Sequence, residues 1–72
     1  SYRAITASSI DDNLEDRPVI VGVYAGPYGT HFVVLSKKSG SDYVMYDPWY
    51  GPDLKFSDYY KKSSIYSAVV FK

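Results

Sequence analysis

Several features that often identify a small domain are missing from this sequence. It contains no cysteine, which excludes a disulfide framework, a thiolate zinc site and a thiol nucleophile within these 72 residues. Its 8 basic and 8 acidic residues give a formal net charge of zero, so we expect no nucleic-acid partner. Apolar runs such as Phe32–Leu35 are far shorter than the ~20 residues of a membrane-spanning helix, so we expect no membrane insertion. The acidic residues lack the spacing of a calcium loop, and we expect neither a metal site nor another cofactor.

The length and the aromatic content of the chain limit the kind of fold that it can form. A chain of 72 residues forms one small domain at most, and a chain of that length buries only ~60% of its extended surface on folding. Nine tyrosines, three phenylalanines and one tryptophan make 18% of the residues aromatic. Tyrosine fills space while keeping a polar tip for water or a partner. This composition suits thin β structure with half-exposed side chains, or a surface that docks another molecule.

The pattern along the chain predicts an α+β fold, with a small antiparallel sheet of about four strands and one or two short helices. One helix is expected to begin with Ser8 or Ser9 as its cap and to end before Pro18. A single helical turn is expected from Ser57 to Lys62. Alternating or dense apolar residues predict the strands, at 18–24, 30–36, 42–47 and 64–71. Polar, glycine- or proline-bearing connections separate them, at 25–29, 37–41 and 49–53.

The second and third predicted strands form a hairpin that concerns the only histidine of the chain. If the hairpin is centred on Ser39, His31 lies directly opposite Asp47, at the open end of the sheet. Opposed Cβ atoms in an antiparallel pair are ~4.5–5.5 Å apart. A shift of one residue would place the two side chains on opposite faces. The pairing of this imidazole with this carboxylate therefore depends on the register.

A histidine beside an aspartate is a pair found in many catalytic sites. A histidine acts as a general base near neutral pH, and a neighbouring carboxylate fixes its tautomer and stabilises the imidazolium. A structural interpretation is the commoner one for such residues, because a lone histidine at the start of a strand is usually structural and Asp-Pro commonly begins a turn. No serine lies in a glycine-flanked nucleophile elbow. From the residues alone, the pair is either a catalytic dyad or a strand residue beside a turn residue.

Three stretches together resemble a known family. RPVIVGV (residues 17–23), GTHFVVL (29–35) and YVMYDPW (43–49) follow one another as they do in the C-terminal half of bacterial papain-like cysteine peptidase domains. The resemblance is greatest to the group related to the double-glycine leader peptidases of bacteriocin export, and it covers residues 8–71. It implies that residues 1–72 are a single partial domain, the C-terminal sheet half of a papain-like fold.

The resemblance also implies a function. His31 matches the catalytic histidine of the family and Asp47 the residue that orients it, so the chain would carry two members of a Cys-His-Asp hydrolase site. From their place in the loops near the pair, Trp49 and Tyr28 are expected to line a groove for a peptide substrate, and the alternative for such loop aromatics is a purely structural role as loop anchors. Thr30 stands where glycine is frequent. More seriously, the family's nucleophilic cysteine and its oxyanion-hole glutamine are both missing from this chain, which makes it catalytically incomplete.

The missing half predicts a partner. Strands as apolar as 18–24 and 31–35 normally need cover on both faces, so we expect a complementary N-terminal segment or another protein chain to pack on the sheet. The chain would then be a processed or excised piece of a bacterial or phage peptidase, or a degenerate module. The alternative function is a non-catalytic binding or structural module of an extracellular or virion assembly, with aromatic loops at 24–28 and 46–50. An extracellular, cell-envelope or virion location is favoured over a cytoplasmic one.

Overall fold

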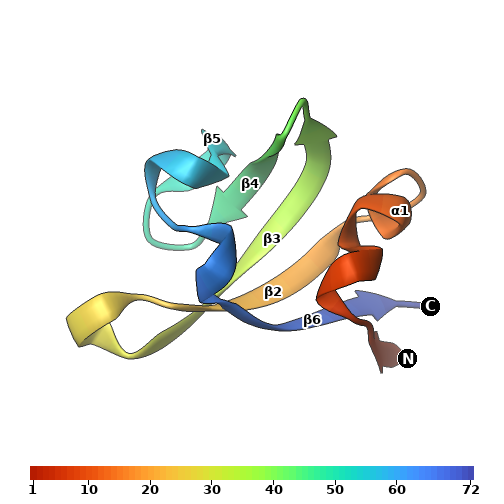
Figure 1. The fold of residues 1–72 in the computed structure, drawn as a ribbon, viewed down its shortest axis with the longest axis horizontal. Helices are drawn as coiled ribbons and strands as arrows, with labels where there is room; N and C mark the ends of the chain where they lie inside the picture. The colour runs from red at the N-terminus through yellow and green to blue at the C-terminus, as the bar shows by residue number, and fades with distance from the viewer.

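The computed structural model describes all residues 1–72 and contains a single antiparallel sheet, with strand order β1-β6-β2-β3-β4-β5 (Figure 1). One α-helix and four 3-10 turns connect the strands. The strands are β1 (Tyr2–Ala4), β2 (Val19–Tyr24), β3 (Thr30–Ser39), β4 (Asp42–Asp47), β5 (Gly51–Lys55) and β6 (Ile65–Phe71). The helix is α1 (Ile10–Leu14), and the 3-10 turns are Ala7–Ser9, Gly26–Tyr28, Phe56–Asp58 and Lys62–Ser64. The predicted α+β class and antiparallel sheet are confirmed.

The two strands beyond the expected four are short ones at the edges of the sheet. β1 pairs with β6, and the two ends of the chain lie side by side (Figure 1). β5 falls in the stretch 49–53 that was expected to be a loop, and that prediction is wrong for its second half. Pro52 fits there because an edge strand leaves one row of backbone groups unpaired, where a missing N–H costs nothing.

The helical predictions are only partly right. α1 follows Ser9 as expected, but neither Ser8 nor Ser9 caps it with a side-chain hydrogen bond, and the hydroxyl of Ser9 donates to the carbonyl of Thr6 instead. The expected single turn from Ser57 to Lys62 is wrong. Two separate 3-10 turns, at 56–58 and 62–64, overlap only the two ends of this stretch.

The hairpin between β3 and β4 has a register that differs from the predicted one. Strand pairing continues through Lys37–Ser39, so only Gly40 and Ser41 form the turn, and Gly40 has the positive φ of 61° that such tight turns favour. Leu35 pairs with Met45, and a bulge separates this pair from the next. The expected connection at 37–41 and the direct pairing of positions 31 and 47 are therefore wrong. Val34 pairs with Tyr46 at this end of the hairpin. If the same register continues by one residue, Asp47 lies opposite Val33, which is two residues from His31.

One face of the sheet carries the core. Alternate residues of the central strands point into it, and α1 and the turn after β5 cover them. Ile10 and Leu14 are the two buried residues of α1, and Phe56 is fully buried at the start of the later turn. The remaining core residues come from the strands: Val19, Val21, Val23, Val33, Leu35, Tyr43, Met45, Ala68 and Val70.

The opposite face of the sheet, which we call the open face, has no layer over it. Its six large aromatic side chains are 41% to 67% exposed, and four come from β2, β3 and β6, next to or within the apolar strands that were expected to need cover. These side chains are Tyr2, Tyr24, Phe32, Tyr46, Tyr66 and Phe71. The chain by itself covers one face of its sheet only.

Candidate active site

The imidazole of His31 and the carboxylate of Asp47 meet at one end of the sheet. The Nε2 atom of His31, at the start of β3, lies 2.7 Å from Oδ1 of Asp47, the last residue of β4. Both side chains point to the same face of the sheet because the bulge and the shorter turn together moved the register by an even number of residues. The side chains meet diagonally, which long or ring side chains can do between neighbouring strands. The predicted pair is present, although its strand residues are not directly opposite.

Asp47 is the most constrained polar residue of the chain. Its side chain is 0% exposed and accepts three hydrogen bonds: from His31, from the backbone N–H of Trp49 at 2.8 Å and from the hydroxyl of Tyr60 at 2.5 Å. Burial by itself would raise the pKa of Asp47, but these hydrogen bonds outweigh it and hold the pKa below its usual value. The carboxylate is therefore ionised at neutral pH.

The charge of Asp47 determines which nitrogen of His31 carries hydrogen. An ionised carboxylate can only accept, so Nε2 must be the donor. The other ring nitrogen, Nδ1, has no hydrogen-bond partner in the chain. Every buried polar side-chain atom of the chain does have a partner. Nδ1 is therefore not fully buried, although the side chain of His31 as a whole is only 9% exposed, and it carries a lone pair when the ring is neutral. This is the arrangement that a general base needs.

The Asp-Pro turn builds part of the site. The N–H of Tyr50 donates to the carbonyl of Asp47 at 3.0 Å, while the N–H of Trp49 donates to the Asp47 side chain. The indole of Trp49 then stacks on the imidazole of His31, with ring centroids 3.5 Å apart and planes 12° from parallel. The same turn therefore orients the carboxylate and covers one face of the histidine. One aspartate is therefore both the turn residue and the hydrogen-bond partner of the histidine.

Tyr60 is a site residue that the sequence did not indicate. It lies between the two 3-10 turns, and its ring packs near Phe56 at 5.7 Å between centroids. Burial and, next, the hydrogen bond to Asp47 raise the pKa of Tyr60, so its hydroxyl remains a donor throughout the neutral range. Nothing in the adjacent pair Tyr59–Tyr60 reveals which ring faces the carboxylate. Only the fold makes that distinction.

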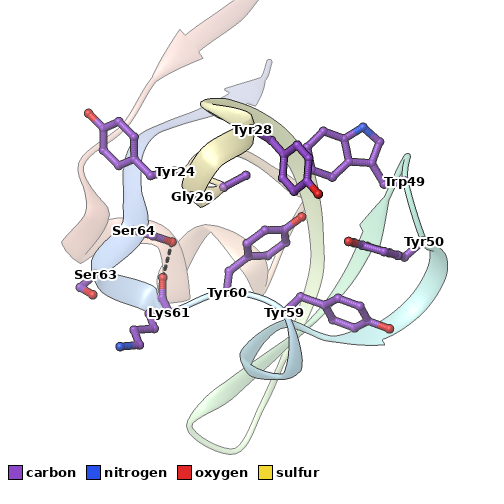
Figure 2. A pocket seen from close by; sticks show the side chains of 11 residues that line it. Tyr24, Gly26, Tyr28, Trp49, Tyr50, Tyr59, Tyr60, Lys61, Ser63 and Ser64 are labelled. Carbon is purple, nitrogen blue, oxygen red and sulfur yellow. Dashed lines mark hydrogen bonds between the residues drawn. The ribbon is translucent and has the colours of Figure 1, made fainter.

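The two residues expected to contact a substrate lie together. Tyr28 and Trp49 have ring centroids 6.0 Å apart at 72°. They border a cavity of about 520 Å³, to which Tyr24, Tyr50, Tyr59 and Tyr60 add further aromatic walls (Figure 2). Lys61 supplies part of the rim, and its ammonium points away from the rings (Figure 2). The aromatic loops at 24–28 and 46–50 thus open onto the same hollow, beside the His31–Asp47 pair.

No protein-family model, curated protein or solved structure matches this chain. The relationship to papain-like peptidases therefore stays a prediction. The chain has no helix that could cross a bilayer and no group of three or more histidine, cysteine, aspartate or glutamate side chains placed to bind a metal ion.

Proposed function

We propose that this chain supplies the histidine and the aspartate of a cysteine-type peptidase site, whose nucleophile comes from polypeptide outside these 72 residues. The observation that carries the proposal is the ionised, fully buried Asp47, which accepts from Nε2 of His31 and leaves Nδ1 open. The resemblance to the C-terminal half of papain-like peptidases supports the same assignment.

The geometry suits each step of such a reaction. Nδ1 of His31 takes the proton of the thiol, and the thiolate attacks the carbonyl carbon of the peptide. The imidazolium that forms is stabilised by Asp47, and it returns the proton to the nitrogen of the leaving amine as the C–N bond breaks. Water then hydrolyses the thioester, again with His31 as base. Trp49 covers the ring and limits the access of water to the pair.

The open face is the proposed docking surface for the missing polypeptide. Exposed aromatic side chains that form one patch usually mark an interface. The open face includes Phe32, which directly follows His31 along β3. The imidazole of His31 projects from the other face, so a polypeptide that covers Phe32 would have to continue around this end of the sheet to bring a cysteine to Nδ1. One partner would then supply both the missing cover and the missing nucleophile.

The test is to express a longer polypeptide that includes the residues encoded before Ser1. We expect it to cleave peptides and to react with a cysteine-directed probe. His31→Ala should lower the rate of cleavage by about 10²–10⁴-fold, the usual contribution of a general base. Lys37→Ala is the control, because Lys37 is an exposed residue of the same strand that lies outside the pair and the aromatic cavity, and this variant should keep full activity.

Two results would contradict the proposal. One is robust hydrolysis by the 72-residue chain alone, which has no cysteine. The other is full activity of the His31→Ala variant in the longer polypeptide.

A second function, a non-catalytic binding module, is favoured by the aromatic cavity beside the pair. A hollow of about 520 Å³ with six aromatic residues in its lining can hold a ligand whether or not a nucleophile is present. If the longer polypeptide has no hydrolytic activity but binds ligands at this cavity, the binding module becomes the better description.

A further inference from the structure

A smaller hollow shares its lining residues with the aromatic cavity. It measures about 220 Å³ and is bordered by Tyr28, Trp49 and Tyr50 alone. Tyr28 and Trp49 meet at 72°, and Trp49 and Tyr50 meet at 88° with ring centroids 6.4 Å apart. Rings that meet near a right angle form a corner, in which one ring presents its edge to the other. Tyr28 is 76% exposed, Tyr50 57% and Trp49 49%. One face of Trp49 lies against His31 and one face of Tyr50 packs against Tyr59, so each of these two rings has at most one face uncovered.

The three aromatic rings of this corner favour a positively charged ligand. The face of an aromatic ring carries the negative part of its quadrupole, which repels anions and attracts cations, most strongly at tryptophan. No lysine or arginine of the chain occupies the corner. The single cation placed over a ring belongs to Lys62, whose Nζ lies 4.7 Å from the centroid of Tyr43, elsewhere in the fold. The corner is therefore a vacant set of cation-attracting faces.

We propose that Tyr28, Trp49 and Tyr50 bind an organic cation, either a quaternary ammonium or the side chain of arginine or lysine. Trp49 stacks on His31 with its indole, so a group held in this corner lies about one ring thickness from the imidazole. If the proposed peptidase function holds, the cation is a basic side chain of the substrate close to the bond that is cleaved. The identification of the cation as a substrate side chain rests on the proposed function, whereas the cation site itself does not.

The binding experiment uses the 72-residue chain and its own reporter. Trp49 is the only tryptophan, so a saturable change of its fluorescence reports on this corner. The probes are choline, Nα-acetyl-arginine amide and two neutral counterparts of similar shape, 3,3-dimethylbutan-1-ol and Nα-acetyl-norleucine amide. We expect each cation to bind about tenfold more tightly than its neutral counterpart, a preference within the range of cation–π interactions.

Variants connect the signal to the corner. Tyr28→Leu and Tyr50→Leu should each weaken cation binding by about fivefold, while circular dichroism confirms that the sheet is retained. Tyr2→Leu is the matched control, because Tyr2 is an exposed tyrosine on edge strand β1, at the other end of the sheet order. It should bind as the wild type does.

Each outcome has one meaning. Equal affinity for cations and neutral counterparts, or no saturable binding of any probe, would overturn the cation site. Binding of choline without binding of the arginine amide would support the site but overturn a basic substrate side chain. Binding is measured without hydrolysis, so its failure is distinct from a failure of the peptidase proposal, which the His31→Ala activity test decides.

Discussion

Removal of one hydroxyl group tests how Asp47 is held. In Tyr60→Phe the ring stays, with its packing near Phe56, and only the donor to Oδ2 of Asp47 is lost. The carboxylate keeps the donors His31 and Trp49, both on Oδ1. The change therefore leaves one buried carboxylate oxygen without a partner and creates no cavity.

The magnitude follows from this loss. An unsatisfied buried polar group costs about 1–3 kcal/mol, with charged groups at the upper end, so we expect Tyr60→Phe to lower the free energy of unfolding by about 2–3 kcal/mol at pH 7. The pKa of Asp47 is lowered in the folded chain, so its contribution is present above the unfolded value of about 3.9 and is lost as pH falls through the folded value. Without the hydroxyl, the folded pKa rises. The difference between variant and wild type should therefore shrink as pH is lowered from 7 to 3.

The assay is urea unfolding followed by the fluorescence of Trp49, at both pH values. Tyr59→Phe serves as the control and should change the free energy of unfolding by no more than about 0.5 kcal/mol, as expected for an exposed site. Equal effects of the two variants at pH 7 would refute the argument. So would a loss of stability in Tyr60→Phe that stays the same at pH 3.

Three further predictions concern the site and the sheet. Asp47→Ala should abolish the preference of His31 for the Nε2–H tautomer, read from its ring ¹⁵N shifts, whereas Asp47→Asn, which keeps an acceptor oxygen, should preserve it. Gly22→Ala should destabilise the chain by about 1–3 kcal/mol, because the new Cβ would lie 2.6 Å from Cζ of Tyr66 and 2.7 Å from Oγ of Ser67. Tyr66→Ala together with Ser67→Ala in the same chain should remove most of that cost. Phe32→Ser, on the open face, should change the free energy of unfolding of the 72-residue chain by no more than about 0.5 kcal/mol. In the longer polypeptide the same substitution should lower the free energy of unfolding by several times that amount. Urea unfolding measures both.

Each of these three has a result that would contradict it. An unchanged tautomer in Asp47→Ala would mean that the carboxylate does not orient the ring. Gly22→Ala with wild-type stability would mean that Tyr66 moves aside without cost. Equal effects of Phe32→Ser in the two polypeptides would mean that the open face stays uncovered.

The strands of the centre could be predicted from the sequence, and those at the edges could not. The stretches 18–24 and 42–47 contain dense apolar or alternating residues, and the strands observed there match them closely. β5 contains Gly51, Pro52 and Asp53, residues typical of loops. Its strand conformation comes from pairing with β4, a tertiary contact that local propensity does not record. The bulge after Leu35 is likewise absent from any pattern, and together with the shorter turn it moved the register by two positions from the predicted one.

The residues of the candidate site could likewise be predicted only in part from the sequence. His31 and Asp47 could be selected because they are residue types with known chemistry at the ends of two predicted strands. Tyr60 could not, since it reaches Asp47 from a segment that joins two 3-10 turns and has no periodic pattern. The stacking of Trp49 on His31 also depends on the turn geometry rather than on spacing. Pairs on regular strands are open to inference, and contacts from irregular segments are not.

The two incomplete features of the molecule favour a common explanation. Every buried polar side-chain atom has a partner, and the core face of the sheet is packed. Nδ1 of His31 is unpaired and the open face is uncovered, and the two features adjoin at the start of β3, where His31 and Phe32 are consecutive residues on opposite faces. Two unrelated deficits would have no reason to adjoin. A single polypeptide that covers Phe32 and presents a thiol to Nδ1 would satisfy both, and this is why the unpaired nitrogen and the exposed aromatic side chains should be tested together in the longer polypeptide.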